Sequence, residues 1–429
     1  MSKIALLFPG QGSQYVGMGK GLIDNYAVAR QTFEEASDVL GYDLPKQCLE
    51  GPDAVLTNTA QAQPAILTMS VAAYRVFRQE FGLTPSVAAG HSLGEFSALT
   101  VAEVFSFSDA VNLVRQRGLL MDEANTLGDG AMLAISQAEL SSIEEACRII
   151  SDQTGLTATI SCFNAPDQFT VSGNRIAIEQ LNDRVTGMFP NVKTTRLNVS
   201  AAFHCSLMSS IVDRFMQVIS NIPLHSPVFP VLSNVTGLPH GDADSIVHNL
   251  VRQLTEPVRW TDNMSHMLQE EQVVFMELGP KSVLRNLARK VTSRPSFAYD
   301  NTDSLESMRT ELGRYTPFGL ISKTLAIAVS IKNREFDTSL YEVGVIRPYQ
   351  AVKSRLMQLE SEGRQPEGED IRQALDMLTS VLHTKQAPSS ETLFRTEQLQ
   401  EQWGQMPEVA EWVNELREIY QMRGDLLHA

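Results

Sequence analysis

The sequence predicts an α/β protein with a small inserted subdomain and a helical C-terminal region. Strand-like and helix-like segments alternate from Ile4–Phe8 onward, which is typical of a sheet with parallel pairs of strands. Between residues 130 and 197 the order becomes strand, helix, strand, strand, helix, strand. From about Thr316 the pattern is almost purely helical. These three sequence patterns predict three structural parts.

The first part begins with the strand at Ile4–Phe8, a Gly-rich turn and helical segments through Gln31–Leu40. Apolar residues at steps of three and four predict a helix over Ala60–Phe81, and a second strand starts at Val87. After the insert, the alternating α/β pattern resumes with the segments FPVLSNVTG and VVFMELGP. We therefore assign 1–128 and 198–315 to one large subdomain.

The other two parts follow from their patterns. The order of elements in 129–197 is that of a ferredoxin-like fold, which predicts a small inserted subdomain. In 316–429, apolar residues recur as one stripe per helix, as at Leu375, Leu378 and Leu382. This helical extension holds no cluster of catalytic residue types, so its simplest interpretation is an appendage that packs on the rest of the protein.

Composition excludes several classes of protein. A chain of 429 residues is longer than a domain with a single hydrophobic core usually is. Its net charge of −15 argues against nucleic acid or an anionic membrane as the main partner. The start MSKIALLFPG leaves no room for a secretory signal, and the apolar segment Leu320–Ile331 is too short to span a bilayer. The four cysteines are scattered, without metal-ligand spacing. We expect a cytoplasmic protein with reduced thiols.

The stretch GHSLG at residues 90–94 matches G-x-S-x-G, the pattern of a nucleophilic serine on a sharp turn between a strand and a helix. Ser92 would be the nucleophile, and the backbone N–H of Leu93 would face a developing oxyanion at the start of the helix. The alternative is a serine in an ordinary tight turn.

A serine nucleophile needs a base, and His204 is the best candidate among the eight histidines. It follows a strand-like run and opens a helix-like one, although a satisfied core histidine would fit the same pattern. His91 adjoins Ser92, but consecutive residues at such a turn usually point apart. The remaining histidines are interpreted as loop or helix-surface residues: His225, His240, His248, His266, His383 and His428.

The Gly-rich start FPGQGSQYVGMGKG does not fit a phosphate-binding loop. Met18 stands where a P-loop needs lysine, and Tyr15 stands where G-x-G-x-x-G needs its third glycine. A loop that follows the first strand and carries Gln11 better suits a side-chain amide directed at a neighbouring site.

Seven motifs in a fixed order closely resemble malonyl-CoA:acyl carrier protein transacylases and the acyltransferase domains of fatty acid and polyketide synthases. They are FPGQGSQ, GHSLGEFSAL, VRQRGLLM, FNAPDQFTVSG, AFHCSLM, QLTEPVRW and FMELGP, and they span about residues 1 to 310. The expected architecture is an α/β-hydrolase-like large subdomain with a ferredoxin-like insert. We expect the active site in the cleft between the two.

The resemblance assigns catalytic roles residue by residue. Ser92 matches the family nucleophile and His204 its base, in a dyad without an acidic third member. The backbone carbonyl that orients the histidine matches Gln253, while Gln11 and the Leu93 amide match the oxyanion hole. Cys205 departs from the serine that usually follows the histidine, which leaves these roles unaffected.

The resemblance also implies the substrate. Arg117 matches the arginine that pairs with the free malonyl carboxylate, a task suited to its planar fork. Phe203 stands where malonyl-specific enzymes carry phenylalanine and would crowd a 2-methyl group. His91 is assigned to the substrate site beside the serine.

The predicted activity is transfer of malonyl from malonyl-CoA to the phosphopantetheine thiol of an acyl carrier protein or a carrier domain of a synthase. Malonyl-CoA is a substrate, and no metal or redox cofactor is implied. One alternative is a hydrolase that clears acyl carriers, against which Arg117 argues; another is a non-catalytic docking subunit. The helical extension resembles those of discrete acyltransferases that serve polyketide assembly lines in trans.

Overall fold

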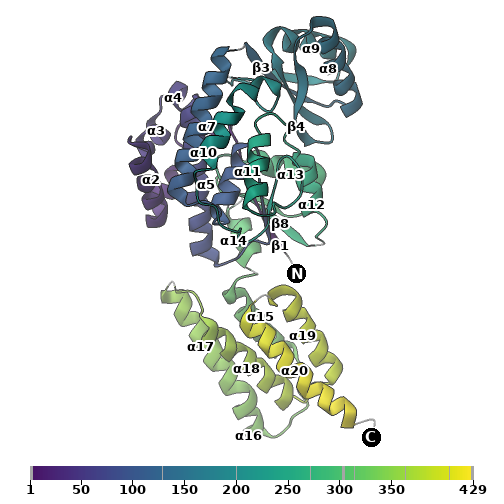
Figure 1. The fold of residues 1–429 in the computed structure, drawn as a ribbon. Helices are drawn as coiled ribbons and strands as arrows, with labels where there is room; N and C mark the ends of the chain where they lie inside the picture. Colours follow the sequence, from purple (N-terminus) through teal and green to yellow (C-terminus); the bar gives the residue numbers. More distant parts are fainter. Residues whose placement is uncertain are drawn as a thin grey trace. The chain divides into compact units, whose positions relative to one another are not determined.

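The computed structural model describes residues 3–127, 129–199, 201–270, 272–301, 305–313, 315–362, 364–404 and 406–426. The chain divides into two compact units. One spans Lys3–Glu80 and Thr84–Leu305, and the other contains Phe81–Leu83 and the chain from Glu306. Figure 1 labels the elements of both. Gly128, at one predicted boundary, lies outside the described residues, and the exact limits of the subdomains stay a prediction.

The first unit is built around a five-stranded sheet in the order β7-β2-β1-β8-β9, in which every pair of neighbours is parallel. Its strands are β1 (Lys3–Phe8), β2 (Val87–Gly90), β7 (Val231–Leu232), β8 (Val273–Glu277) and β9 (Ser296–Ala298). The register places Phe8 opposite Gly90, so β1 and β2 end side by side. This parallel sheet confirms the predicted α/β class.

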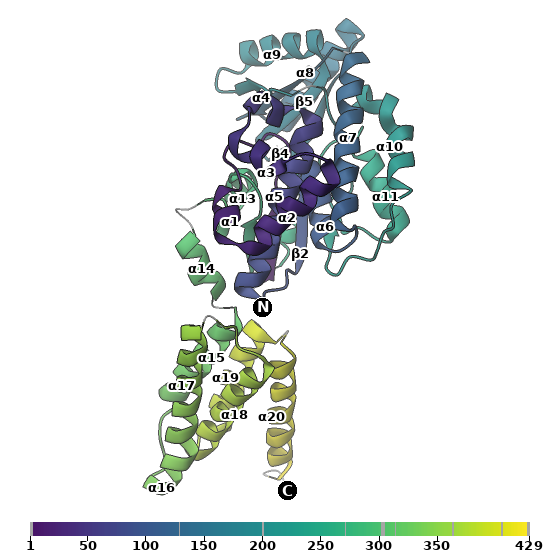
Figure 2. The same ribbon diagram turned by 90° about the vertical axis from the view of Figure 1, so that its left-hand side faces the viewer.

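Helices cover this sheet because its side chains alternate between two buried faces. Ala5, Leu7 and Phe275 share a core with α12 and α13, while α6 packs on the strands and on α7. Figure 2 shows α7, α10 and α11 side by side. The helices are α1 (Lys20–Asn25), α2 (Ala27–Leu40), α3 (Leu44–Glu50), α4 (Asp53–Thr57), α5 (Thr59–Phe81), α6 (Leu93–Val101), α7 (Phe107–Leu127), η1 (Ser206–Ile211), α10 (Val212–Ile219), α11 (Ala243–Arg252), α12 (Trp260–Met267) and α13 (Val283–Val291).

A second, antiparallel sheet in the same unit has the order β4-β5-β3-β6. Its elements are β3 (Gly130–Ser136), α8 (Leu140–Thr154), β4 (Ala158–Ala165), β5 (Gln168–Asn174), α9 (Arg175–Met188) and β6 (Lys193–Arg196). Helices α8 and α9 pack together on the sheet around Ile143, Leu181 and Val171 (Figure 1). This strand order and the two helices are those of a ferredoxin-like fold, as the sequence pattern predicted.

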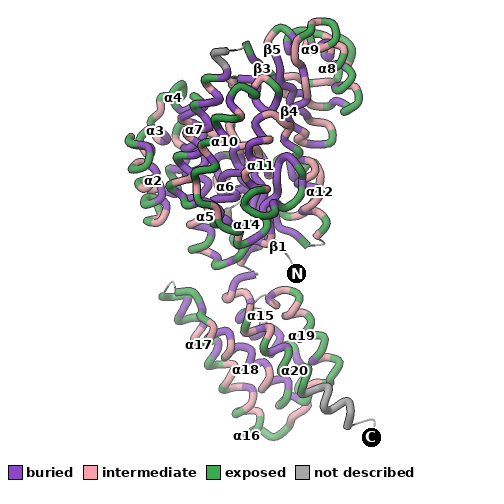
Figure 3. The backbone as a smooth tube through the Cα atoms, viewed as in Figure 1, coloured by how far each residue is buried: buried purple, intermediate pink, exposed green. Residues whose placement is uncertain are grey.

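The second unit is helical and has a core of its own, which includes Leu320, Leu378 and Trp412. Buried residues mark the inner sides of its helices in Figure 3. Its elements are α14 (Leu305–Gly313), α15 (Pro317–Ser330), α16 (Thr338–Tyr341), the π-helix η3 (Glu342–Ile346), α17 (Arg347–Glu362), α18 (Gly368–Thr384), α19 (Ser389–Trp403) and α20 (Pro407–Leu426). Across the described part of the chain, no helix combines the length and the apolar character needed to cross a membrane.

Helix α6 approaches the five-stranded sheet so closely that two glycines are required. A Cβ on Gly94 would lie 1.9 Å from the carbonyl oxygen of Phe8, and a Cβ on Gly90 would lie 1.8 Å from the carbonyl carbon of Gly94. Both neighbours are backbone atoms, which cannot rotate out of the way. The sequence G-H-S-L-G therefore sets the distance between the first turn of α6 and the ends of β1 and β2.

We predict that Gly94→Ala destabilises the protein by about 3 kcal/mol, the upper end of the overpacking range, because the added methyl overlaps a backbone carbonyl. Denaturant unfolding of the whole protein would measure the change in the free energy of unfolding. Gly187→Ala, in α9 with nothing within 4 Å of the new Cβ, is the matched control. It should stabilise slightly because alanine favours helix. A Gly94→Ala protein as stable as the parent would contradict this close approach.

Candidate active site

Ser92 lies between β2 and α6, and its backbone has the unusual angles φ 53° and ψ −108°. A non-glycine residue at positive φ needs support from its surroundings. Asn234 supplies it: its Oδ1 accepts from the Ser92 N–H at 2.7 Å, and its Nδ2 donates to the Gly90 carbonyl at 2.6 Å. The serine therefore sits on a strand-to-helix turn that a buried asparagine side chain holds from both sides.

The hydroxyl of Ser92 is paired with His204. The Ser92 Oγ lies 2.7 Å from His204 Nε2, and His204 Nδ1 lies 2.6 Å from the backbone carbonyl of Gln253. A carbonyl can only accept, so Nδ1 carries the proton and Nε2 presents a lone pair to the serine. The imidazole is thus held in the tautomer that can remove a proton from Ser92.

Burial keeps the His204 imidazole neutral. The residue is only 3% exposed, and burial lowers its pKa to about 3, with a further lowering from the positive charge of Arg117. The hydrogen bond to the Gln253 carbonyl opposes this shift. His204 is therefore in its basic form throughout the neutral range.

Arg117 comes from α7 and is buried beside the serine. Its Nη1 donates to Gln63 Oε1 at 2.9 Å, and its Nη2 donates to Gln253 Oε1 at 2.9 Å and to Ser92 Oγ at 3.3 Å. Its Nε is buried without a partner, and among the described residues no carboxylate forms an ion pair with the guanidinium. Burial lowers its pKa to about 10, which still leaves it charged. A buried cation thus faces the serine without a direct counter-charge.

A cavity of about 270 Å³ opens onto these groups between the two sheets. Gln11, Leu93 and Phe203 line it from the large sheet's side, and Met132 and Thr170 line it from the ferredoxin-like side. The Nε2 of Gln11 donates to the Thr59 hydroxyl at 3.3 Å. The cavity is also lined by Ser92, His204 and Arg117, and Gln253 contacts it only through its hydrogen bonds to these three residues.

The two histidines near Ser92 have different hydrogen-bond partners. His91 lines the cavity, but its Nε2 lies 2.8 Å from Asn164 Oδ1 and its ring centroid lies 5.8 Å from that of Trp260. His204, and not His91, therefore contacts the serine hydroxyl.

The interpretation of His240 as a surface residue was wrong. Its side chain is fully buried, with Nε2 at 2.7 Å from a carboxylate oxygen of Glu95, also fully buried. The sequence around His240 resembles a loop, and only the folded chain brings Glu95 to it. His428 lies outside the described residues.

Sequence reasoning missed three polar residues around the site: Gln63, Asn234 and Glu95. Glu95 left a signal, because it is the one charged residue in α6, a helix whose residues are all buried. A lone carboxylate in an apolar helix must be paired, and this could have directed attention to it. Among the described residues, no three His, Cys, Asp or Glu side chains are grouped as metal ligands would be. The lack of a cofactor stays a prediction.

Comparison with known proteins identifies the family. The sequence model described as "Acyl transferase domain" matches residues 5–316. The protein therefore belongs to the acyl transferase domain family. The match includes both sheets and α14, and it ends at residue 316, directly before α15.

Relatives differ in whether they include this helical unit. The malonyl CoA-acyl carrier protein transacylase of Escherichia coli (strain K12) is 38% identical over 312 residues, 73% of this chain and 100% of its own. A Bacillus subtilis protein of the same name is 35% identical over 402 residues, 92% of this chain and 99% of its own. A match of 402 residues cannot fit within residues 5–316, so it extends into the helical unit.

Solved structures resemble the first unit. A malonyl-transacylase in complex with a holo type II PKS acyl-carrier protein is 40% identical, with a TM-score of 0.69, covering 72% of this chain and 100% of that chain. An acyl carrier protein S-malonyltransferase from Vibrio cholerae is 39% identical, with a TM-score of 0.67 and the same coverage. These likenesses support the α/β fold class.

We predict that His204 stays neutral from pH 7.5 down to pH 5, since its pKa lies near 3. The folded pKa is below the ordinary value of about 6.5, so His204 stabilises the fold fully above pH 6.5 and loses that contribution as the pH falls toward 3. Nitrogen NMR shifts of labelled histidine, assigned with His204→Gln, would report the charge directly. A titration of this signal near pH 6.5 would contradict the prediction.

Proposed function

We propose that the protein is an acyl carrier protein S-malonyltransferase that acts in the cytoplasm. The observation that carries the proposal is the buried Arg117 guanidinium, 3.3 Å from the Ser92 hydroxyl and without a carboxylate partner among the described residues. A carboxylated acyl group bound to Ser92 would supply that counter-charge. The names of the similar transacylases point to the same substrate class.

In the first half-reaction, Ser92 Oγ attacks the thioester carbonyl of malonyl-CoA while His204 Nε2 takes the hydroxyl proton. The Leu93 N–H at the start of α6 and the Gln11 side chain would stabilise the oxyanion. The carbon–sulfur bond then breaks, and His204 returns the proton to the departing CoA sulfur. The product is a malonyl ester on Ser92.

In the second half-reaction, the phosphopantetheine thiol of the carrier protein attacks this ester, with His204 again as base. Its sulfur displaces Ser92, which recovers its proton. Hydrolysis would follow the same path with water as the acceptor. Arg117 favours transfer of malonyl over hydrolytic clearance of uncharged acyl groups, because a buried cation disfavours a substrate that cannot pair with it.

Phe203 supports malonyl as the donor among carboxylated acyl groups. It lines the cavity, is 6% exposed and directly precedes His204. Its ring would occupy the space that a 2-methyl substituent needs. We infer that Phe203 disfavours methylmalonyl, although one methyl group is worth only about 1 to 3 kcal/mol in a pocket.

The carrier would approach along α13, which borders the cavity through Val283, Leu284 and Leu287. The same helix carries Arg285, Arg289 and Lys290, a basic surface suited to an acidic carrier protein. The Bacillus subtilis relative shares the helical unit and the Escherichia coli relative does not. Since the helical extension resembles those of discrete acyltransferases that act in trans, we infer an enzyme that serves carrier domains of a polyketide or related synthase.

The direct test is mass spectrometry of the protein after brief incubation with a mixture of malonyl-, methylmalonyl- and acetyl-CoA. We expect a malonyl adduct on Ser92. Addition of a holo acyl carrier protein should then transfer the malonyl group from Ser92 to the carrier. Ser92→Ala should abolish the adduct while leaving the fold intact by circular dichroism. An adduct on a cysteine, or release of free malonate without a labelled carrier, would contradict the proposal.

We predict that Arg117→Ala lowers malonyl loading by a factor of about 10² to 10³, because the malonyl carboxylate would then be buried without a partner, at about 3 to 5 kcal/mol. Loading of acetyl, which has no carboxylate, should hold or rise. Both rates are measured on one preparation, so misfolding affects them alike. Equal losses for the two donors would overturn the carboxylate-binding role of Arg117.

A further inference from the structure

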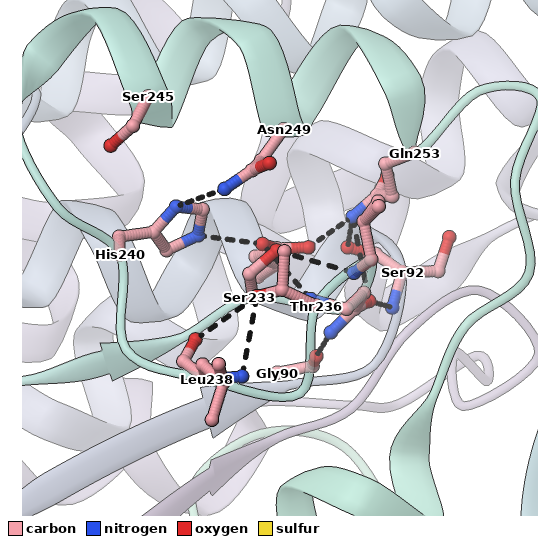
Figure 4. Close-up of polar contacts among 12 residues, drawn as sticks. Gly90, Ser92, Ser233, Thr236, Leu238, His240, Ser245, Asn249 and Gln253 are labelled. Atoms are coloured by element: carbon pink, nitrogen blue, oxygen red, sulfur yellow. Dashed lines mark hydrogen bonds and ion pairs between the residues drawn. The ribbon is translucent and has the colours of Figure 1, made fainter.

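Glu95 is a fully buried carboxylate one turn after Ser92. Its Oε1 accepts from His240 Nε2 at 2.7 Å and from the Asn234 N–H at 3.2 Å, and its Oε2 accepts from Gln253 Nε2 at 2.6 Å. Figure 4 shows His240, Gln253 and Ser92 around this cluster. All three partners donate, so an ionised carboxylate satisfies them and a neutral amide cannot satisfy all of them.

Gln253 connects this carboxylate to Arg117. Its Nε2 donates to Glu95 at 2.6 Å, and its Oε1 accepts from Arg117 Nη2 at 2.9 Å. Because Glu95 can only accept, it fixes which end of the amide is NH₂ and so turns the amide oxygen toward the guanidinium. The same Nη2 lies 3.3 Å from Ser92 Oγ.

The imidazole of His240 lies between Glu95 and Asn249. Its Nε2 lies 2.7 Å from Glu95 Oε1. Its Nδ1 lies 3.5 Å from Asn249 Nδ2 (Figure 4). On the other side, Glu95 is one amide group away from Arg117: burial lowers the pKa of the guanidinium, and the carboxylate opposes that lowering.

We propose that Glu95 is a positioning residue for recognition of the carboxylated acyl group: through the Gln253 amide it holds the Arg117 guanidinium against Ser92. This inference rests on the proposed malonyl transfer. It assigns the selectivity for a charged acyl group to three side chains in series, of which only Arg117 meets the substrate. The backbone carbonyl of Gln253 separately orients His204, so Gln253 serves both the base and the selectivity.

The test compares malonyl and acetyl loading of Ser92 in Glu95→Gln. The new amide must set an NH₂ group against one of three donors, and reversal of the Gln253 amide would turn its NH₂ toward Arg117. We expect the malonyl-to-acetyl rate ratio to fall by about tenfold to a hundredfold, as for loss of a hydrogen bond to a charged group. Glu145→Gln, at an exposed glutamate of α8, is the matched control and should leave both rates unchanged.

Two further variants separate positioning from a structural role. Gln253→Met keeps the backbone carbonyl for His204 but removes the amide bridge, so it should lower the same ratio even if Glu95→Gln fails to fold. In an Arg117→Ala background, Glu95→Gln should leave the ratio unchanged. Equal losses for both donors, or an unchanged ratio in the single variants, would overturn this inference. Absence of malonyl loading in the parent protein would instead overturn the proposed function itself.

Discussion

The contact between α6 and the ends of β1 and β2 determines the geometry on which the site depends. Gly94 packs against the Phe8 carbonyl and Gly90 against Gly94, at distances that exclude any side chain. This contact forces the chain to turn within Ser92, at φ 53°. Ser92 and Leu93, on either side of this turn, both line the cavity. Chemistry at Ser92 therefore starts from a backbone packing constraint.

Gln253, at the end of α11, connects the Ser92 turn to the other polar groups of the site. Gln253 caps that helix, and its carbonyl, its amide nitrogen and its amide oxygen each have a different partner in the site. Its Nε2 also donates to the Ser92 carbonyl at 3.0 Å, so one residue contacts the turn, the base and the cation. Burial makes each of these bonds strong and makes the loss of any partner costly. The Nε of Arg117 is the atom of this network that is left without a protein partner.

Much of the fold follows from local pattern. Ile4–Phe8 alternates between two buried faces, and the order of elements in 129–197 has few compatible topologies, so both were predictable. Ser92 and His204 lie 112 positions apart, and periodicity does not show that they meet. The local pattern made His204 the best candidate base but left a core histidine as an equal alternative, and the resemblance to a family decided between the two. His240 was misjudged because a polar residue in a loop becomes buried only through a tertiary partner. Glu95 provides that partner, and no local rule links the two.

Among the described residues, the helical unit contains an apolar core of its own, formed by residues from Leu320 to Leu416. Two relatives illustrate the consequence, since one matches this chain with the helical unit and the other without it. The hydrogen-bond partners described for Ser92 all precede residue 306, so a recombination event near that point that adds or removes the helical unit leaves these partners of the nucleophile in place.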